Sequence, residues 1–374
     1  MRVIYPGNIK KYLITVILTV CSLSHNSPLY AQGEVGTLIS ESVEDTESAI
    51  KAYGGPFLKA IGSDLNSAWV NNAEPMEWGS LSLRFVGVTS FAPDGDLSFK
   101  PSEYGLDDAQ KGGLYTSEET LPTIFGQAAN AQIQARATSP DGSEIQTMTT
   151  VPLQTLGVRG APMLMPQLNI GFFGGSQIMI RGLPPMSIPS YKELQSFETS
   201  YFGIGFLHDI KQWIPEFRSS QFSWSVYFTY STAELKLDGP FYTFTDLQAN
   251  SQSNIEASGS LPDYGQQEMG FNTKGYSLGS VISKEFSAIT LFGGLEYVSS
   301  STNLDLLGQY PYANYEKELE HITDLLDINE TTGRMGINGG LRVKMSFLRL
   351  TLSGTLVNGG YSTVTFSLGF RLFK

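Results

Sequence analysis

Eight basic side chains alternate with apolar residues along the chain, and this spacing makes them the strongest candidates for binding chemistry. They are Arg84, Arg136, Arg181, Arg334, Arg342, Lys344, Arg349 and Arg371. Alternate side chains of a β-strand point to opposite faces of its sheet, so these residues share the polar face of their strands. Acids such as Asp209 and Glu296 are few on that face. We therefore predict a net basic polar face that can bind carboxylates.

Four acidic residues lie near the start of the chain, in the segment that precedes the first strand-like stretch. They are Glu41, Glu44, Asp45 and Glu47. One hypothesis is that this acidic segment plugs a barrel lined by the basic residues, where a ligand with a carboxylate could compete with it. The alternative is that the arginines are permanently paired within the wall and only hold its shape.

His208 and Asp209 are adjacent, and a histidine beside an acid can act as a general base. In a strand, however, neighbouring residues point to opposite faces. His208 shares its face with Phe202, Ile204 and Phe206. We therefore predict that His208 and Trp213 anchor the protein at a membrane interface, where aromatic side chains are enriched.

Neither catalysis nor a bound metal is indicated elsewhere in the sequence. The triplet Asp94-Gly95-Asp96 is too short for a calcium loop, which needs a longer series of oxygen ligands. His321 has no obvious serine partner in its segment. We expect no enzymatic activity, no metal and no cofactor.

These side chains lie on segments with a two-residue period, which is typical of half-buried β-strands. The last stretch, YSTVTFSLGFRLFK, is the clearest case, because Val364, Phe366 and Leu368 alternate with polar residues. We predict about twelve strands, within a range of ten to fourteen. They lie near residues 80–92, 127–138, 143–154, 163–172, 176–185, 199–211, 221–235, 271–284, 288–300, 332–345, 348–357 and 361–373.

The joins between these strands predict an all-β fold, a transmembrane antiparallel barrel. Short joins alternate with long ones, the longest being residues 92–126, 236–270 and 301–331. An even number of strands, with short turns at one end and long loops at the other, is typical of outer-membrane barrels. A secreted β-sandwich also alternates, but the polar residues at strand centres favour a barrel with a watery lumen.

The sequence predicts three regions. Residues 1–31 have a basic start followed by a short apolar run, which indicates a cleaved signal peptide that holds the sole cysteine, Cys21. Residues 32–77 are expected to form a plug of two short helices separated by Gly54-Gly55-Pro56, and residues 78–374 the barrel. The net charge of −12 argues against nucleic acid as a partner.

The segment YEKELEHITDLLDINE, residues 315–330, spaces its apolar residues like one face of a helix and carries six acids. One interpretation is a gate over the outer mouth that binds divalent cations together with lipopolysaccharide. The other is a solvated charged helix.

Several motifs resemble a family of uncharacterised outer-membrane barrels, found mostly in Bacteroidetes and distantly similar to the FadL-type channels for hydrophobic compounds. They are MPQLNIG at 165–171, IMIRGLP at 178–184, and GFLHDIKQWIP at 205–215. The resemblance implies a monomeric barrel with an N-terminal plug that admits amphipathic or apolar molecules. The sequence departs from FadL-type channels in its strand number and in ending on Lys374 rather than an aromatic residue.

We therefore expect a protein of the outer membrane, surrounded by lipid and lipopolysaccharide, that passively admits hydrophobic or amphipathic small molecules. The alternative is a structural or surface-binding barrel that transports nothing, and a third candidate is an outer-membrane hydrolase. A continuous path through the lumen favours the first function, and a lumen sealed by paired side chains favours the second. A Ser/His/acid cluster at the outer rim favours the third.

Overall fold

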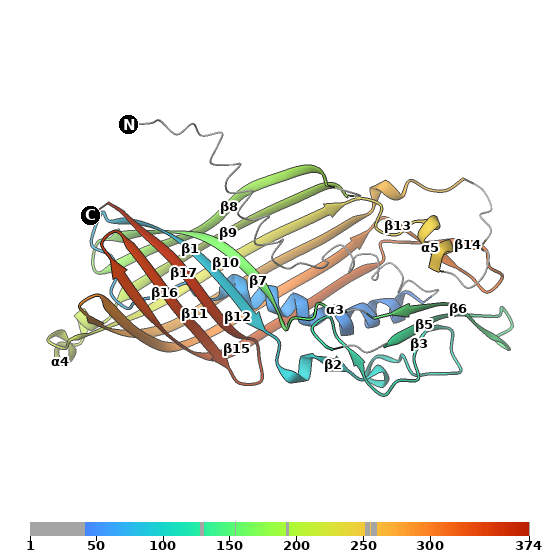
Figure 1. Cartoon of the computed structure of the whole chain (residues 1–374), viewed down its shortest axis with the longest axis horizontal. Coiled ribbons are helices and arrows are strands. Elements are labelled where there is room, and N and C mark those ends of the chain that lie inside the picture. The colour runs from blue at the N-terminus through green and yellow to red at the C-terminus, as the bar shows by residue number, and fades with distance from the viewer. Residues whose placement is uncertain are drawn as a thin grey trace.

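Ten antiparallel strands close into a barrel in the computed structural model, which describes residues 42–127, 131–153, 155–191, 194–250, 255 and 260–373 (Figure 1). The order around the barrel is β1-β17-β16-β15-β12-β11-β10-β9-β8-β7. The strands are β1 (Leu81–Phe91), β7 (Gly160–Phe172), β8 (Ser176–Tyr191), β9 (Leu194–Asp209), β10 (Phe222–Asp238), β11 (Glu268–Phe286), β12 (Ile289–Leu307), β15 (Leu326–Met345), β16 (Leu348–Val357) and β17 (Ser362–Phe373). The expected barrel is confirmed.

The last strand, β17, pairs with both β16 and β1 and so closes the barrel. Val364 and Phe366 are exposed on its outer face, whereas Thr363, Thr365 and Ser367 are buried on its inner face. The two-residue period therefore separates an oily outside from a polar inside, as the sequence predicts.

Two of the twelve expected strands lie outside the barrel. β5 (Gln132–Thr138) and β6 (Ile145–Pro152) form a separate three-stranded sheet with β3 (Gly113–Tyr115). β2 (Ser98–Phe99) pairs with β4 (Leu121–Pro122) in the same insertion, residues 92–159. We call this insertion between β1 and β7 the outer layer. Alternation identified these strands correctly, but it cannot tell which sheet a strand joins.

The two ends of the barrel differ in their connections (Figure 1). One end, here called the turn end, has the short joins 173–175, 287–288 and 346–347, and β17 ends there. The longer join 210–221 lies at the same end and contains η3 (Lys211–Trp213) and α4 (Pro215–Arg218). The opposite loop end carries the outer layer and the joins 239–267 and 308–325, which contain α5 (Phe244–Asn250), η4 (Tyr264–Gln266), β13 (Gln309–Ala313) and β14 (Leu319–Thr323).

The segment 315–330 does not form the helix that its apolar spacing predicts. Leu319–Thr323 is a strand that pairs with β13, and Leu326 begins the long strand β15. Leu325, Leu326 and Ile328 are buried in the core at the loop end. A short apolar run fits either period, and here the neighbouring strands decide the outcome.

A single helix, α3 (Val43–Asn66), runs from the outer layer into the barrel and replaces the two short helices that the sequence predicts. Ser42 caps it by accepting a hydrogen bond from the Asp45 backbone N–H at 3.1 Å. Pro56 lies within the helix but does not end it. We call α3 and the extended residues 67–80 the plug, because they run from the outer layer through the lumen to the turn end. No helix in the part of the chain that the structure describes is long and apolar enough to span a membrane.

Small residues let the helix lie close to the barrel wall. A Cβ atom added to Gly62 would lie only 2.9 Å from the Ser300 Cβ on β12, closer than packed atoms approach. On the wall, a Cβ added to Gly203 would lie 2.9 Å from the ring of Trp69. A helix with its side chains is about 10–12 Å wide, so a ten-stranded barrel has room for it only where such small residues face it.

Candidate functional site

A row of polar side chains runs across six neighbouring strands on the inner face of the barrel. The register places Lys344 opposite Arg349, Arg349 opposite Gly369, and Gly369 opposite Arg84. The row continues through Gln167 to Arg181. Parity predicts that these basic residues face inward, and the structure places them there. The closing of the barrel by β17 brings the C-terminal arginines beside Arg84.

Arg84 and Arg181 hold the plug where α3 ends. The Arg84 Nη2 donates to the carbonyls of Ala68 at 2.5 Å and Trp69 at 2.9 Å. The Arg181 Nη1 donates to the Ser67 carbonyl at 2.9 Å, and its guanidinium lies 4.1 Å from the centre of the Trp69 ring. Both arginines are buried. These three carbonyls directly follow the last helical residue, Asn66, so the two cations lie at the negative end of the helix dipole and stabilise this end of the plug.

Gln167 joins these two arginines into one network. Its Oε1 accepts from the Arg84 Nη2 and the Arg181 Nε, each at 2.8 Å. Its Nε2 donates to the Trp69 carbonyl at 3.1 Å. Since an amide side chain both donates and accepts, Gln167 can bind two cations and the plug backbone at once.

A cavity of about 260 Å³ lies between the plug and the wall at the turn end, and we call it the vestibule. Five basic side chains line it: Arg84, Arg342, Lys344, Arg349 and Arg371. Three acidic side chains also line it, Glu74 and Glu77 of the plug and Glu285 of β11. The cations therefore outnumber the anions around this space.

Only part of this basic charge is paired. Lys344 forms an ion pair with Glu285, and the Arg371 Nη2 lies 3.6 Å from the Glu77 Oε2. The Arg342 Nη2 donates to the Thr290 Oγ1 at 3.4 Å. Among the described residues, four buried nitrogens of the arginines around the vestibule have no hydrogen-bond partner: Arg84 Nε, Arg342 Nε, Arg349 Nη1 and Arg371 Nε. Arg84 and Lys344 are therefore paired inside the barrel, as the alternative hypothesis expects, whereas these four nitrogens are not.

Three basic residues of the predicted set do not line the vestibule: Arg181, which holds the plug, and Arg334 and Arg136. Arg334 is on the inner face of β15 nearer the loop end, where it lines a narrow opening of about 30 Å³ with Glu296 and Tyr361. Arg136 lies on β5 in the outer layer, so the prediction that it lines the lumen is wrong. Its guanidinium lies 3.5 Å from the centre of the Tyr115 ring, and it donates to Gln134.

Glu296 faces inward as predicted but has hydroxyl and amide partners rather than an arginine. Its carboxylate accepts from the Tyr227 hydroxyl at 2.5 Å, the Thr355 hydroxyl at 2.8 Å and the Asn338 Nδ2 at 3.3 Å. These residues lie on four strands, β10, β12, β15 and β16. The buried carboxylate therefore ties the inner wall together across the lumen.

The acidic start of the plug does not meet the basic row. Asp45 pairs with Lys111 of the outer layer, with 3.2 Å between the Lys111 Nζ and the Asp45 Oδ1. Glu44 is exposed and Glu47 is partly exposed in the same part of α3. Glu41 lies outside the described residues. The hypothesis that these acids pair with the lumen arginines is wrong for Asp45, because α3 begins at the loop end and the basic row lies near its other end.

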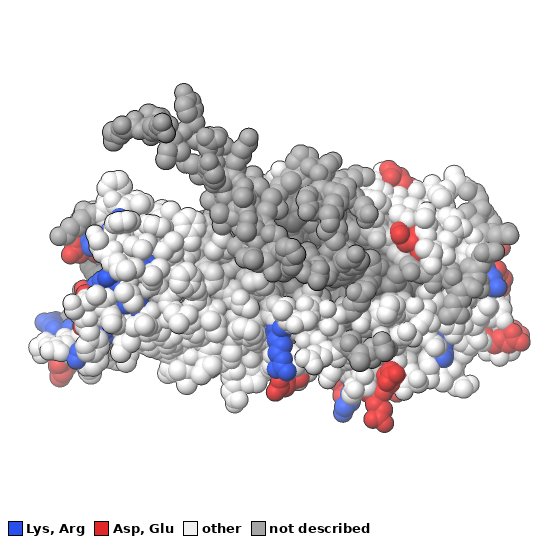
Figure 2. Space-filling view, in the orientation of Figure 1, with Lys and Arg blue, Asp and Glu red and all other residues white. Residues whose placement is uncertain are grey.

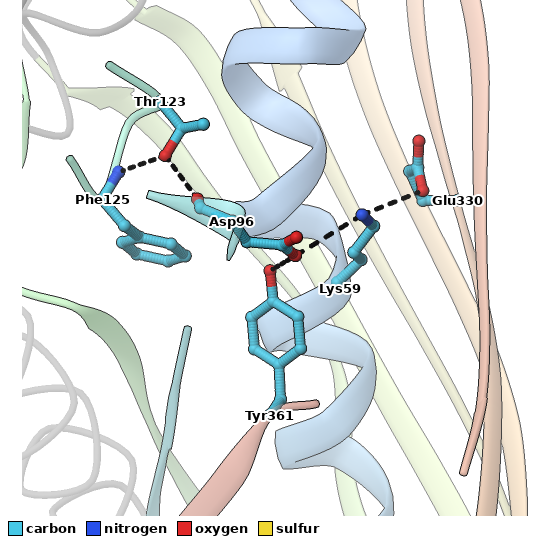
Figure 3. Close-up of polar contacts among 6 residues, drawn as sticks. All are labelled: Lys59, Asp96, Thr123, Phe125, Glu330 and Tyr361. Carbon is cyan, nitrogen blue, oxygen red and sulfur yellow. Dashed lines mark hydrogen bonds and ion pairs between the residues drawn. The ribbon is translucent and has the colours of Figure 1, made fainter. Parts of the chain in front are cut away.

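A second polar cluster joins the plug to three other elements near the loop end (Figure 3). The Lys59 Nζ of α3 lies 3.5 Å from the Asp96 Oδ2 of η1 (Asp94–Asp96) and 3.9 Å from the Glu330 Oε2 of β15. The Tyr361 hydroxyl, in the turn before β17, donates to the Asp96 Oδ2 at 2.6 Å. We call Lys59, Asp96, Glu330 and Tyr361 the latch.

Further contacts hold the latch in place. The Thr123 hydroxyl donates to the Asp96 backbone carbonyl at 2.7 Å, which fixes η1 within the outer layer (Figure 3). Burial, together with the hydrogen bond to Asp96, raises the pKa of the Tyr361 hydroxyl well above its ordinary value, so it remains a donor. Sequence reasoning did not bring these residues together, because Lys59, Asp96 and Glu330 are far apart in the chain and meet only in the folded barrel.

His208 and Trp213 lie together on the outside of the turn end. The Trp213 Nε1 donates to the His208 Nε2 at 2.9 Å, and the Ser176 hydroxyl lies 2.9 Å from the His208 Nδ1. Trp213 is 69% exposed. Asp209 instead accepts a hydrogen bond from the Lys211 backbone N–H. The predicted positions on opposite faces are confirmed, whereas the role as interface anchor stays a prediction. Within the described residues, no group of three or more His, Cys, Asp or Glu side chains could hold a metal ion.

Residues 9–372 match a family described as "Family of unknown function (DUF6588)". No curated protein matches the chain. Among solved structures, Ail, the attachment invasion locus protein of Yersinia pestis, is 8% identical, with a TM-score of 0.24 over 79% of this chain and 98% of Ail. A Pseudomonas aeruginosa FadL homologue is 10% identical, with a TM-score of 0.21 over 86% of this chain and 96% of the homologue. The copper transporter OprC is 10% identical, with a TM-score of 0.28 over 82% of this chain and 46% of OprC. Likeness at these TM-scores does not bear on what the chain does.

Proposed function

The chain belongs to the family of unknown function DUF6588, and from its own geometry we propose that it is an outer-membrane β-barrel that its N-terminal plug keeps closed. When the plug shifts, the barrel admits hydrophobic or amphipathic small molecules passively. We also propose that it acts as a monomer without enzymatic activity, with outer-membrane lipid and lipopolysaccharide around its wall.

The outer face of the barrel supports a place in the membrane. Exposed apolar side chains cover it on successive strands, among them Phe206, Leu278, Leu295, Ile337, Leu352 and Phe366. On the face in Figure 2, a band of barrel wall without charged residues separates the charges at the turn end from those nearer the loop end. A closed barrel has no unpaired strand edge, which lipid would penalise by several kcal/mol for each backbone group. The turn end would face the periplasm and the loop end the outside.

The composition of the inner wall supports passage more than any other observation. Buried side chains that face the lumen carry hydroxyl groups on strand after strand: Ser225, Thr229, Ser231, Thr273, Ser277, Ser300, Thr302 and Thr365. If the plug moved aside, water could hydrate these groups without a large exposure of apolar surface.

Conductance of the refolded protein in a planar bilayer tests this proposal. We expect discrete openings that a long-chain fatty acid changes or blocks, since the fatty acid is an amphipathic ligand of the proposed kind. A fully inserted barrel that stays silent under all conditions would refute passage.

A second function, that of a closed structural or surface-binding barrel, is favoured by the core at the loop end. Ile50, Tyr53 and Leu58 of α3 belong to one buried apolar cluster with Leu114 and Phe125 of the outer layer. This part of the helix is integral to the outer layer, which faces other cells or surface partners in this alternative. This second function predicts a barrel that conducts no current in a planar bilayer and whose loop end binds a partner.

A further inference from the structure

We infer that the vestibule binds a small, free molecule with two or more anionic groups, either phosphates or carboxylates. This goes beyond passage through the lumen, because the site is complete while the plug is in place.

The first observation is the unpartnered donors. Arg84 is 4% exposed and Arg342 is 7% exposed, and both side chains line the vestibule, while the Nε of each is buried without a partner among the described residues. A buried guanidinium N–H without a partner is unfavourable, so a bound acceptor stabilises it. Arg349 Nη1 and Arg371 Nε are two more buried donors without a partner, in side chains that line the same cavity.

The second observation is the spacing of the cations. Arg349 and Arg84 both lie opposite Gly369, one strand to either side of it. Neighbouring strands are about 4.8 Å apart, so the backbones of these two arginines are about 10 Å apart. Gly369, which has no side chain, lies between them. Arg371 lies two residues further along the same strand as Gly369, and Arg342 lies two residues before Lys344. One carboxylate cannot reach all these donors, whereas a molecule with two anionic groups can.

The third observation concerns size and access. A volume of about 260 Å³ corresponds to roughly eight or nine water molecules at about 30 Å³ each, which suits a molecule of about ten non-hydrogen atoms. Glu77, at the plug side of the cavity, has a side chain that is 73% exposed, so the vestibule has a route to solvent. The position inside the barrel favours a free anion over a lipid headgroup, whose chains would have to leave the bilayer.

Calorimetric titration of the refolded full chain in a neutral detergent tests the site, with inorganic pyrophosphate as the dianionic probe. Orthophosphate tests the need for two groups, and sodium chloride at matched ionic strength tests for a general salt effect. A short-chain phosphatidic acid tests a lipid source. We expect pyrophosphate to bind at one site and at least tenfold more tightly than orthophosphate, with no saturable heat from the chloride or the lipid.

Arg349→Gln and Arg136→Gln form a matched pair, because each removes one positive charge and only Arg349 lines the vestibule. We expect Arg349→Gln to weaken pyrophosphate binding at least tenfold and Arg136→Gln to leave it unchanged. Arg342→Gln repeats the test on a second strand. Absent binding, equal effects of Arg349→Gln and Arg136→Gln, or tighter binding of phosphatidic acid would overturn the inference. Because binding is measured on the closed barrel, its failure would leave the conductance result unaffected.

Discussion

Adding one methyl group to the plug at Gly62 should loosen it, whereas the same change at Gly54 should not. Both glycines lie in α3. A Cβ at residue 62 would contact the Ser300 hydroxyl and lie 2.9 Å from the Ser300 Cβ and 3.1 Å from the Thr302 Oγ1. A Cβ at residue 54 would have nothing within 4 Å. Gly62→Ala and Gly54→Ala therefore differ only in their contact with the wall.

The size of the effect follows from two opposing contributions. Replacing glycine by alanine in a helix stabilises it by about 1 kcal/mol, and this gain is common to both variants. Overpacking costs about 1–3 kcal/mol, and only the variant at residue 62 incurs it. Since about 1.4 kcal/mol is a factor of ten, the undocked state of the plug should be roughly 5- to 150-fold more populated in Gly62→Ala than in Gly54→Ala.

Native-state hydrogen exchange of the α3 amides measures this difference directly, because protection reports the free energy of local opening. We expect the amides around residue 62 to lose protection in Gly62→Ala and to keep or gain it in Gly54→Ala. Equal protection in the two variants would refute the close contact between the helix and β12. It would then also remove the physical basis for a tightly docked plug.

Three further predictions test the latch, the membrane-facing wall and the partly buried His321. Lys59→Met should lower the free energy of unfolding by about 1–2 kcal/mol, because it leaves Asp96 and Glu330 without their cation. The control Lys100→Met breaks an exposed pair with Glu103 and should change the free energy of unfolding by less than about 1 kcal/mol. Equal guanidinium unfolding midpoints for the two variants would contradict a stabilising latch. Leu352→Arg places a charge on the outer face of β16 and should lower the free energy of unfolding in lipid vesicles by about 2–4 kcal/mol. The control Leu261→Arg lies in a loop and should leave this free energy nearly unchanged. Similar unfolding curves for the two variants would argue against a lipid-facing wall. Partial burial lowers the pKa of His321, whose Nε2 lies 3.0 Å from the Tyr264 hydroxyl. The unfolded chain therefore takes up this proton at a higher pH than the folded chain, and the free energy of unfolding should fall as the pH drops below about 6.5. His321→Gln should remove this part of the pH dependence, and an unchanged pH profile of stability in the variant would contradict the prediction.

The faces of the strands could be predicted from the sequence, because a two-residue period assigns each side chain to one side of a sheet. This correctly placed His208 outside, and Arg181 and Arg342 inside. The neighbours of each strand could not be predicted in the same way. Arg136 has the same alternation as the lumen arginines, but β5 pairs with β3 and β6 rather than with a barrel strand.

The candidate sites depend on long-range register, which a local pattern does not contain. Arg349 and Arg84 lie on either side of Gly369 only because β17 pairs with both β16 and β1. Similarly, Lys59 meets Glu330 only because α3 lies along β15 inside the lumen. The segment 315–330 shows the converse, since its helical spacing yields to pairing with β13 and β12.

The central claim, that the plug must move for molecules to pass, can be tested by locking it to the wall. Gly62→Cys and Ser300→Cys, in a chain without Cys21, place two thiols on facing elements. A Cβ at residue 62 lies 2.9 Å from the Ser300 Cβ, so a small outward shift reaches the roughly 3.5–4.5 Å that a disulfide needs. We predict that the oxidised barrel is silent in a planar bilayer and that reduction of the disulfide restores openings. Equal conductance in the two redox states, or silence in both, would contradict the account.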